Sequence, residues 1–518
     1  MLEIDGNHLS LADVAAVARG GAPVKLAEAG AAAVQVSRAR LLDLSQGSKP
    51  VYGVNTGFGL FCDRKIDNGD AVHLSRNLIL SHAVGTGDPL PTEIVRAAML
   101  VRANALAKGF SGVRREIIDC LLEMLNRKLT PSVPEQGSLG SSGDLCPLSH
   151  LALVFTTDVR DREEDSGQAV FEGKIMSGKQ AMEKAGLQRL ILGAKEGLAV
   201  NNGATFSAAI GALAVLDALH LLDIADLCAA MTLEALLGCP EAFDPRIHAV
   251  RPHPGQARCA AGIRALTEDS TLVGADGRVQ DAYSLRCAPQ VHGSAREAVD
   301  YVRQVIEREL NAATDNPLLF EGGATLSGGN FHGEPVGMAM DFLGIAVAEL
   351  ASISERRLYR LLDDKLNAGL PPMLVGTPEN AGLNSGLMML QYTAAALVLE
   401  NQRLASPDSV LSLPTSGGQE DHNANSMSAA RKARQIVKNT TQVLALELCA
   451  AVRALELRLR QRPMANLGKG TGEVYSALLQ QLTFTDNDSW WSPEIEKVRR
   501  FIEDDKLPLS CLVEANRV

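Results

Sequence analysis

The feature that most constrains the fold is an unbroken run of helix-forming residues from Phe206 to Leu237. The run reads FSAAIGALAVLDALHLLDIADLCAAMTLEALL, is rich in alanine and leucine, contains no proline, and is too long for a strand. Asp217, His220, Asp223 and Asp226 interrupt its apolar residues, and each charge would be costly in lipid. The segment therefore predicts a long helix inside a water-soluble bundle rather than a membrane span.

Similar helical patterns follow at Glu334–Leu362, Asn384–Leu404 and Ala430–Leu459. Small and apolar residues occupy more than one side of each stretch, which is typical of buried helices. Packed nearly parallel, these segments would form a central bundle larger than an ordinary four-helix unit, and oligomerisation would cover the faces that one chain cannot. The predicted fold class is mainly α.

The two halves of the chain differ in pattern. Residues 1–200 are rich in glycine, proline and short segments, which predicts a loop-rich N-terminal region, whereas residues 201–518 are dominated by long helices. The boundary is expected near Asn201. Four segments between the helical patterns are interpreted as loops, where a rigid scaffold often presents functional groups: VQDAYSLRCAPQVHG, NAATDNPLLF, LSGGNFHGEP and SLPTSGGQEDHN.

Charge and cysteine usage narrow the possible partners. A formal net charge of -11 and a pI of about 5.5 argue against a nucleic-acid partner, which normally needs a concentrated basic face. The nine cysteines are spread without any C-x-x-C pair, so no disulfide framework or thiolate metal site is indicated. The N-terminus lacks the basic and apolar regions of a secretory signal. We therefore expect a cytoplasmic protein that binds neither nucleic acid nor membrane.

The stretch GSLGSSGDLCPLSH, residues 137–150, places a Ser-Ser-Gly triplet immediately before a helix signal. Pro147 suits a first helical turn, and LSHLALVF continues the helix. Taken alone, such a segment is most often a flexible turn and helix cap.

This stretch nevertheless resembles the signature of the histidine, phenylalanine and tyrosine ammonia-lyases, whose usual triplet is Ala-Ser-Gly followed by Asp-Leu and Pro-Leu-Ser. In that family the triplet cyclises autocatalytically into 4-methylideneimidazole-5-one (MIO), an electrophilic prosthetic group. The resemblance gives Gly143 the attacking nitrogen, Ser141 the attacked carbonyl carbon and Ser142 the hydroxyl that is lost. Gly143 has no Cβ to obstruct the close backbone approach. Residue 141 is expected to contribute only its backbone, so serine in place of alanine should be tolerated.

Blocks of sequence that resemble those of the ammonia-lyases extend from about residue 50 to residue 430. In VYGVNTGFG, Tyr52 corresponds to the tyrosine usually assigned as the catalytic base, a role that requires its phenol pKa to be lowered by its surroundings. Asn202 in GLAVNNGATF corresponds to the asparagine that holds the prosthetic group. In VQDAYSLRCAPQ, the resemblance makes Tyr283 a second active-site tyrosine and Arg286 the guanidinium that grips the substrate carboxylate.

Two further residues complete the implied site. By resemblance, Asn316 in TDNP is a hydrogen bonder on the carboxylate side, and Phe331 in GGNFHGEP is a pocket wall; each alone would be a turn or core residue. The implied reaction is non-oxidative elimination of ammonia from an aromatic L-amino acid. It needs an electrophile because the amine is a poor leaving group and no side chain offers comparable electrophilicity.

Two motifs point to the substrate. The pair Ser81 and His82 in NLILSHAVG is similar to that of histidine-specific members, and a histidine can exchange a hydrogen bond with an imidazole. The run QEDH at residues 419–422 is also like that of histidine ammonia-lyases and places Gln419 and Glu420 in the substrate site. A carboxylate in a pocket built for a phenyl ring would be an uncompensated desolvation cost. The predicted reaction is therefore L-histidine to urocanate.

The sequence also departs from the family pattern. After His422 it reads NANSM, a short insertion relative to the histidine enzymes, and His292 stands where an apolar residue is expected. These differences leave open a tyrosine or phenylalanine ammonia-lyase, or a 2,3-aminomutase of the same family. The resemblance further implies a homotetramer whose active sites combine loops of several subunits.

Two alternative functions are disfavoured by the sequence, a non-catalytic scaffold and a metal site. A catalytically silent helical scaffold is disfavoured because the matching residues occur together: Tyr52, Ser142, Asn202, Tyr283 and Arg286. A metal site on the first long helix would use Asp217, His220, Asp223 and Asp226, but steps of three residues drift by about 60° each around a helix and do not converge easily. No metal is expected.

Overall fold

A computed structural model of the chain describes residues 1–45 and 51–515. The chain forms two compact units, each built from three segments of sequence. The first comprises residues 1–216, 302–341 and 407–432, and the second comprises residues 217–301, 342–406 and 433–518. Long helices contribute residues to both units: α9 (Thr205–Ala235), α13 (Ala288–Leu310), α14 (Glu334–Leu362) and α16 (Ser426–Gln461). The predicted division into residues 1–200 and 201–518 describes sequence pattern, whereas these compact units each combine distant segments of the chain. The predicted division therefore stays a prediction.

The predicted fold class, mainly α, is confirmed. α9 and α16 contain nearly all of the predicted runs, and α14 has the predicted bounds. The fourth predicted helix, α15 (Met388–Leu404), begins later than Asn384, because Gly386 just before it adopts a φ of +60° that a helix cannot contain.

One predicted loop is largely helical in the structure. The segment VQDAYSLRCAPQVHG contains α12 (Tyr283–Arg286) and the start of α13. Pro289 is tolerated there because it lies in the first turn of α13, where its missing N–H would have no helical partner. The helix continues because buried residues recur at helical spacing: Ala295, Val299, Val302, Ile306 and Leu310.

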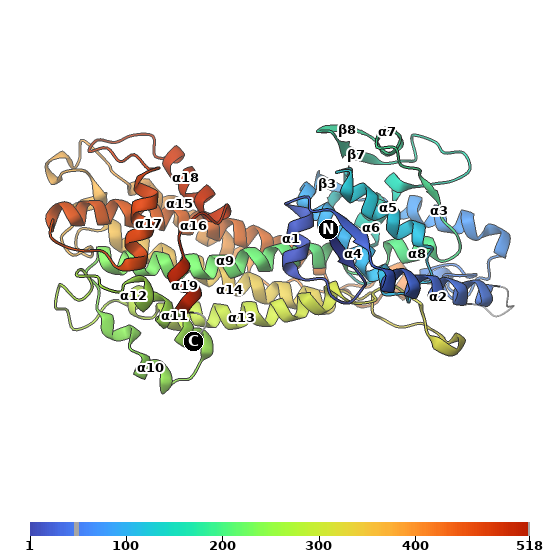
Figure 1. Cartoon of the computed structure of the whole chain (residues 1–518), viewed down its shortest axis with the longest axis horizontal. Coiled ribbons are helices and arrows are strands. Elements are labelled where there is room, and N and C mark those ends of the chain that lie inside the picture. Colours follow the sequence, from blue (N-terminus) through green and yellow to red (C-terminus); the bar gives the residue numbers. More distant parts are fainter. Residues whose placement is uncertain (46–50, 516–518) are drawn as a thin grey trace. The chain divides into compact units, whose positions relative to one another are not determined.

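In the second unit α9, α13, α14 and α16 run side by side (Figure 1). A buried polar network joins them. Thr232 donates to Glu447 Oε1 over 2.9 Å, Arg357 pairs with the same carboxylate at 2.6 Å, and His292 Nδ1 lies 2.7 Å from Asp226 Oδ1. The network explains why Asp226 interrupts the apolar run, and why a polar residue occupies position 292. Buried charges of this kind are stable only when paired.

α9 and α14 are each long and apolar enough to cross a bilayer by length and composition alone. In both, 72% of the apolar window is buried inside the structure. Their apolar character is therefore accounted for by packing within the protein, as expected for the core helices of a bundle.

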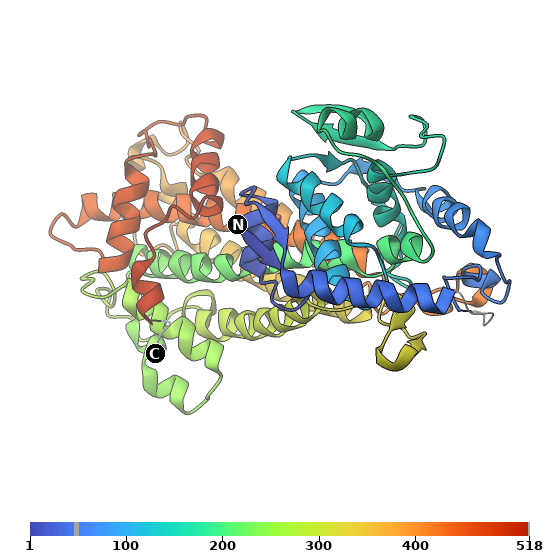
Figure 2. The same ribbon diagram turned by 45° about the vertical axis from the view of Figure 1, so that its right-hand side comes forward.

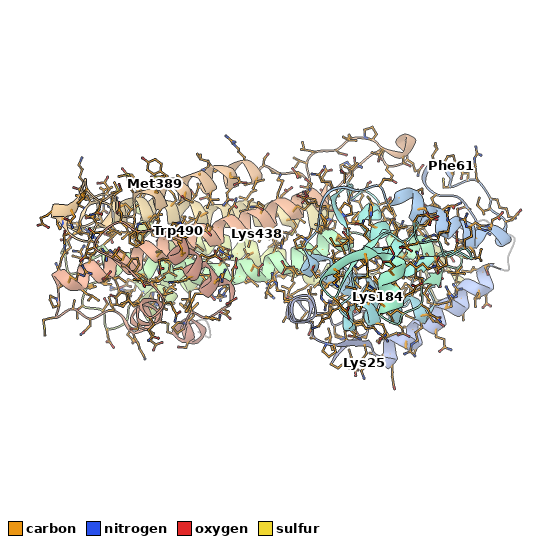
Figure 3. The ribbon with its side chains drawn as sticks, turned by 90° about the horizontal axis from the view of Figure 1, so that it is seen from above. Lys25, Phe61, Lys184, Met389, Lys438 and Trp490 are labelled. Atoms are coloured by element: carbon orange, nitrogen blue, oxygen red, sulfur yellow. The ribbon has the colours of Figure 1, made fainter. Side chains whose placement is uncertain are left out.

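The remaining helices of the second unit are shorter: α10 (Pro245–Ala249), α11 (Pro254–Leu266), α12, α15, α17 (Lys469–Leu479), α18 (Ser492–Glu503) and α19 (Ser510–Ala515). Met389 on α15 and Trp490 before α18 are exposed side chains of this unit (Figure 3).

The first unit combines helices with short strands. Its helices are α1 (Leu11–Ala18), α2 (Glu28–Ser45), α3 (Ala71–His82), α4 (Thr92–Ala107), α5 (Arg115–Asn126), α6 (Leu145–Phe155), α7 (Gly178–Lys184) and α8 (Glu196–Asn201). α2 is the long blue helix in the foreground of Figure 2. α4 is buried along nearly its whole length and forms the core of this unit.

The strands of the first unit form small sheets. β1 (Leu2–Ile4) pairs in parallel with β2 (Val24–Leu26), and β6 (Thr156–Thr157) with β9 (Leu190–Ile191). The antiparallel pairs are β3 (Thr86–Pro89) with β5 (Pro134–Gln136) and β10 (Leu318–Leu319) with β11 (Thr325–Leu326). β4 (Thr130–Pro131), β7 (Gln168–Phe171) and β8 (Lys174–Ser177) form a three-stranded sheet in that order.

Three of these helices determine where the site lies. α3, α6 and α8 pack on one another. α3 ends at His82, α6 begins directly after the Ser-Ser-Gly segment, and α8 ends one residue before Asn202. The packing of these helices therefore gathers residues that are far apart in the sequence.

Candidate active site

The Ser-Ser-Gly triplet lies in a tight turn that only glycine permits at its ends. Gly140 and Gly143 have φ angles of +75° and +74°, and the Gly143 N–H donates to the Gly140 carbonyl oxygen over 3.3 Å. A Cβ on Gly143 would lie 2.1 Å from the carbonyl carbon of Gly203. Glycine is thus required at position 143 both by the backbone angle and by the close approach of a second backbone segment.

The carbonyl oxygen of Ser142 receives two donors from that second segment. Asn202 Nδ2 donates to it over 2.8 Å and the Gly203 N–H over 3.2 Å. Asn202 is buried, and its Oδ1 has no hydrogen-bond partner in the part of the chain that the structure describes. Two fixed donors on one carbonyl oxygen stabilise negative charge that develops there, as in an oxyanion hole.

Arg102, which the sequence interpretation did not single out, holds the Asn202 segment in place. Arg102 is 1% exposed, and its guanidinium donates to the carbonyl oxygens of Ala199 and Asn202 over 3.0 and 2.8 Å. Burial lowers the pKa of Arg102 to about 10. The available signal was an arginine within the apolar helix sequence TEIVRAAMLVRANALA, since arginine is rarely buried unless it is paired.

Asp144 follows the triplet directly and anchors its C-terminal end. The sequence interpretation did not single out this residue either. Its buried carboxylate accepts hydrogen bonds from the Ser207 backbone N–H and from Ser138 Oγ, both over 2.8 Å. Burial raises the pKa of Asp144, and these hydrogen bonds oppose that rise. The carboxylate thus ties the segment before α6 to the first turn of α9.

Glu420 is brought against the triplet from a distant loop. Ser141 Oγ donates to Glu420 Oε2 over 2.7 Å, and Ser142 Oγ donates to Oε1 over 3.1 Å. The backbone of this loop is closed by the Thr415 N–H, which donates to the Glu420 carbonyl oxygen over 2.8 Å. One carboxylate therefore binds the hydroxyls of both serines.

These groups border a cavity of about 1220 Å³ within the first unit. The sequence-predicted residues that line it are Tyr52, Ser81, His82, Ser141, Ser142, Asn202, Asn316, Phe331, Gln419 and Glu420. Leu60 and Phe61 also line it and are exposed; Figure 3 shows Phe61. The cavity is large enough for an amino-acid substrate.

Burial shifts the pKa values of Tyr52 and His82, two residues of the cavity lining. Burial raises the pKa of the Tyr52 phenol; the Gly59 backbone amide opposes this, and the Glu420 carboxylate adds to it. The expected lowering of that pKa is therefore wrong for this chain. His82 Nδ1 lies 3.0 Å from Ser81 Oγ, and burial lowers the pKa of His82, which favours a neutral imidazole.

The amide oxygen and the amide nitrogen of Asn316 both form hydrogen bonds with the neighbouring loop. Its Oδ1 accepts from the Gly328 N–H over 2.8 Å, and its Nδ2 donates to Ser327 Oγ over 3.0 Å. Phe331 lies further along this loop as part of the cavity wall. In the structure Asn316 therefore shapes the wall through its contacts with the loop.

The insertion after His422 has a defined place. The ring of His422 stacks on that of His332, with centroids 5.9 Å apart and planes 10° apart. Asn423 N–H donates to Ser412 Oγ over 2.9 Å, and Asn425 N–H donates to the Leu139 carbonyl oxygen over 2.7 Å. The extra residues thus connect the Glu420 loop to the segment that carries the triplet.

Tyr283 and Arg286 are not among the residues that line this cavity. Both belong to the second unit, where the Arg286 guanidinium lies 4.8 Å from the centroid of the Tyr283 ring. Tyr283 is 70% exposed. Within the described part of one chain, the cavity therefore lacks the two groups expected to complete it.

The helical fold and the cavity built around a Ser-Ser-Gly turn are those of a lyase. Residues 9–480 match the model of the family described as aromatic amino acid lyase, and the chain belongs to that family.

Named relatives agree with this assignment. The chain is 49% identical over 482 residues to a histidine ammonia-lyase of Caldanaerobacter subterraneus subsp. tengcongensis, which covers 92% of each protein. A solved histidine ammonia-lyase from Trypanosoma cruzi is similar with a TM-score of 0.89 and 36% identity, covering 99% of this chain and 95% of that one. A tyrosine aminomutase from Streptomyces globisporus has a TM-score of 0.91 and 34% identity, covering 99% and 98%. Because the aminomutase shares the fold, the substrate must be argued from the site.

Proposed function

We propose that this protein eliminates ammonia from L-histidine to give urocanate. The observation that carries the proposal is the position of Glu420, whose carboxylate lies against Ser141 and Ser142 in a cavity that His82 also lines. An imidazole offers an N–H to the carboxylate and a ring nitrogen to His82, whereas a phenyl ring would leave both unpaired. The identity of 49% to a protein named histidine ammonia-lyase supports the same substrate.

The prosthetic group is proposed to be MIO, made from Ser141, Ser142 and Gly143. The Gly143 nitrogen bonds to the Ser141 carbonyl carbon, whose oxygen leaves as water, and Ser142 loses its Cα proton and its hydroxyl as a second water. The turn fits this chemistry because Gly143 is already folded back on Gly140, and because Asn202 and Gly203 hold the Ser142 carbonyl oxygen. The exocyclic methylidene of this group supplies the electrophile that makes the substrate amine a better leaving group.

The residues of the chain itself would bind the substrate and move its protons. Asn202 Nδ2 and the Gly203 N–H stabilise negative charge on the Ser142 carbonyl oxygen. Glu420 accepts the imidazole N–H, and Tyr52 accepts the β-proton. Because the pKa of Tyr52 is raised, only a minor ionised fraction is available near neutral pH.

The substrate carboxylate is proposed to bind Arg286 of another subunit in a homotetramer, with Tyr283 beside it. The proposal is supported by the position of both residues outside the cavity lining. Co-expression of Tyr52→Phe and Arg286→Ala chains tests it. Shared sites predict that some sites regain both groups and activity, whereas verified mixed tetramers with no activity would contradict them.

A cytoplasmic location is also proposed. All nine cysteines are free in the structure, which suits a reducing compartment. Fractionation of the native host cells, with activity measured in each fraction, tests it.

Substrate choice is tested by following product absorbance with L-histidine, L-tyrosine and L-phenylalanine, and by analysing the mixtures for β-amino acids. We expect urocanate from histidine at the highest kcat/KM. If histidine were the poorest of the three, the proposed reading of Glu420 and His82 would be wrong. β-Amino acid products would instead indicate an aminomutase.

A further inference from the structure

The side chain of Ser141 makes a contact that cyclisation of its backbone does not require. Ser141 is 7% exposed, and its hydroxyl donates to Glu420 Oε2 over 2.7 Å. The alanine that is usual at this position in the family has no such donor. The two serines are the hydrogen-bond donors that the described structure shows for the Glu420 side chain.

Maturation would affect these two donors differently. Dehydration of Ser142 removes its hydroxyl as water, so Glu420 Oε1 loses its partner. The hydroxyl of Ser141 takes no part in that chemistry, since residue 141 gives up only its carbonyl oxygen. Glu420 Oε2 therefore keeps its donor while Oε1 becomes free.

A glutamate held at one oxygen is better prepared for a ligand than an unheld one. Glutamate loses rotamer freedom when it is immobilised, and a partner already in place reduces the part of this cost that falls on ligand binding. The Ser141 contact is a hydrogen bond to a charged acceptor, one of the stronger kinds.

We propose that Ser141 is a positioning residue for substrate recognition: it fixes Glu420 through Oε2 so that Oε1, freed by the loss of the Ser142 hydroxyl, accepts the imidazole N–H of L-histidine. This inference rests on the proposed function. It replaces the sequence expectation that residue 141 contributes only its backbone.

The test compares Ser141→Ala, Ser141→Thr and Glu420→Gln in the full-length enzyme, with peptide mass and steady-state kinetics measured for each. In Ser141→Ala, we expect the peptide containing residues 141–143 still to lack two waters, and KM for L-histidine to rise about tenfold, or about 1.4 kcal/mol, with a smaller change in kcat. Ser141→Thr, which keeps the hydroxyl, should restore most of the affinity. In a Glu420→Gln background, the Ser141→Ala change should have much less effect, because coupled residues are not additive.

Ser354→Ala is the matched control. Ser354 is a buried serine of the second unit whose hydroxyl has no hydrogen-bond partner in the described structure, and its loss should leave KM unchanged. An unaltered KM in Ser141→Ala, an equal effect in the Glu420→Gln background, or a peptide that no longer loses water would each overturn the positioning role. Failure of the unaltered enzyme to form urocanate would instead overturn the proposed function.

Discussion

Asn202 offers the most direct test of how the backbone around the triplet supports catalysis. Asn202→Ala removes the 2.8 Å donor to the Ser142 carbonyl oxygen and leaves the 3.2 Å donor from Gly203. Loss of one such donor typically costs about 10²–10³-fold in kcat, or about 2.7–4 kcal/mol. Because the shorter of the two contacts is removed, we expect kcat to fall at least about a hundredfold. KM should change little, since this interaction strengthens as charge develops in the transition state.

The assay is urocanate formation at saturating L-histidine, with the mass of the peptide spanning residues 141–143 measured on the same preparation. Asn201→Ala is the control: Asn201 is the buried neighbour, but its Nδ2 donates to Ser149 Oγ over 3.1 Å. That variant should lose stability and keep most of its kcat. A kcat close to that of the unaltered enzyme, in Asn202→Ala protein that has lost both waters, would refute the role of this donor.

Four further outcomes are expected. Ser142→Ala should leave a peptide that cannot lose the second water and should abolish turnover; retained turnover would exclude MIO as the electrophile. Since burial and the Glu420 carboxylate raise the pKa of Tyr52, and only the ionised phenol accepts a proton, kcat/KM should rise with pH above neutrality; a profile that falls over this range would exclude Tyr52 as the base. Arg357→Met leaves the Glu447 carboxylate buried without its 2.6 Å partner and should cost about 3–5 kcal/mol, detected as a clearly lower thermal midpoint; an unchanged midpoint would mean that the pair contributes little. His82→Leu should weaken kcat/KM for L-histidine by about 1–3 kcal/mol through an unsatisfied ring nitrogen, and unchanged constants would show that His82 does not contact the ring.

Much of the fold could be predicted because its signal is local. The helix from Thr205 to Ala235 follows from helix-forming residues without a proline, and the helix from Glu334 to Leu362 was predicted to the residue. The start of α15 was less predictable, because the turn at Gly386 depends on a backbone angle that its neighbours in space also influence. α13 was missed where a proline and a cluster of polar residues resemble a loop.

The residue types of the site could also be predicted, because cyclisation needs a hydroxyl and a glycine next to each other in the sequence. The contacts between them could not. Ser141 and Glu420 are separated by 279 positions, and no local pattern indicates that the serine would donate to that carboxylate. The same holds for Arg102, which supports the segment of Asn202 from a helix a hundred residues earlier.

By itself, then, the sequence determined the long helices, the reactive triplet and the family, because helix periodicity and covalent chemistry depend on neighbours along the chain. Only the tertiary structure decided that Asn202 and Gly203 converge on the Ser142 carbonyl oxygen, that Glu420 binds both serine hydroxyls, and that the pKa of Tyr52 is raised rather than lowered. These properties depend on burial and on groups brought close through space. The packing of α3, α6 and α8 gathers the triplet, His82 and Asn202, the Glu420 loop joins them from a distant part of the sequence, and no window of sequence contains these contacts.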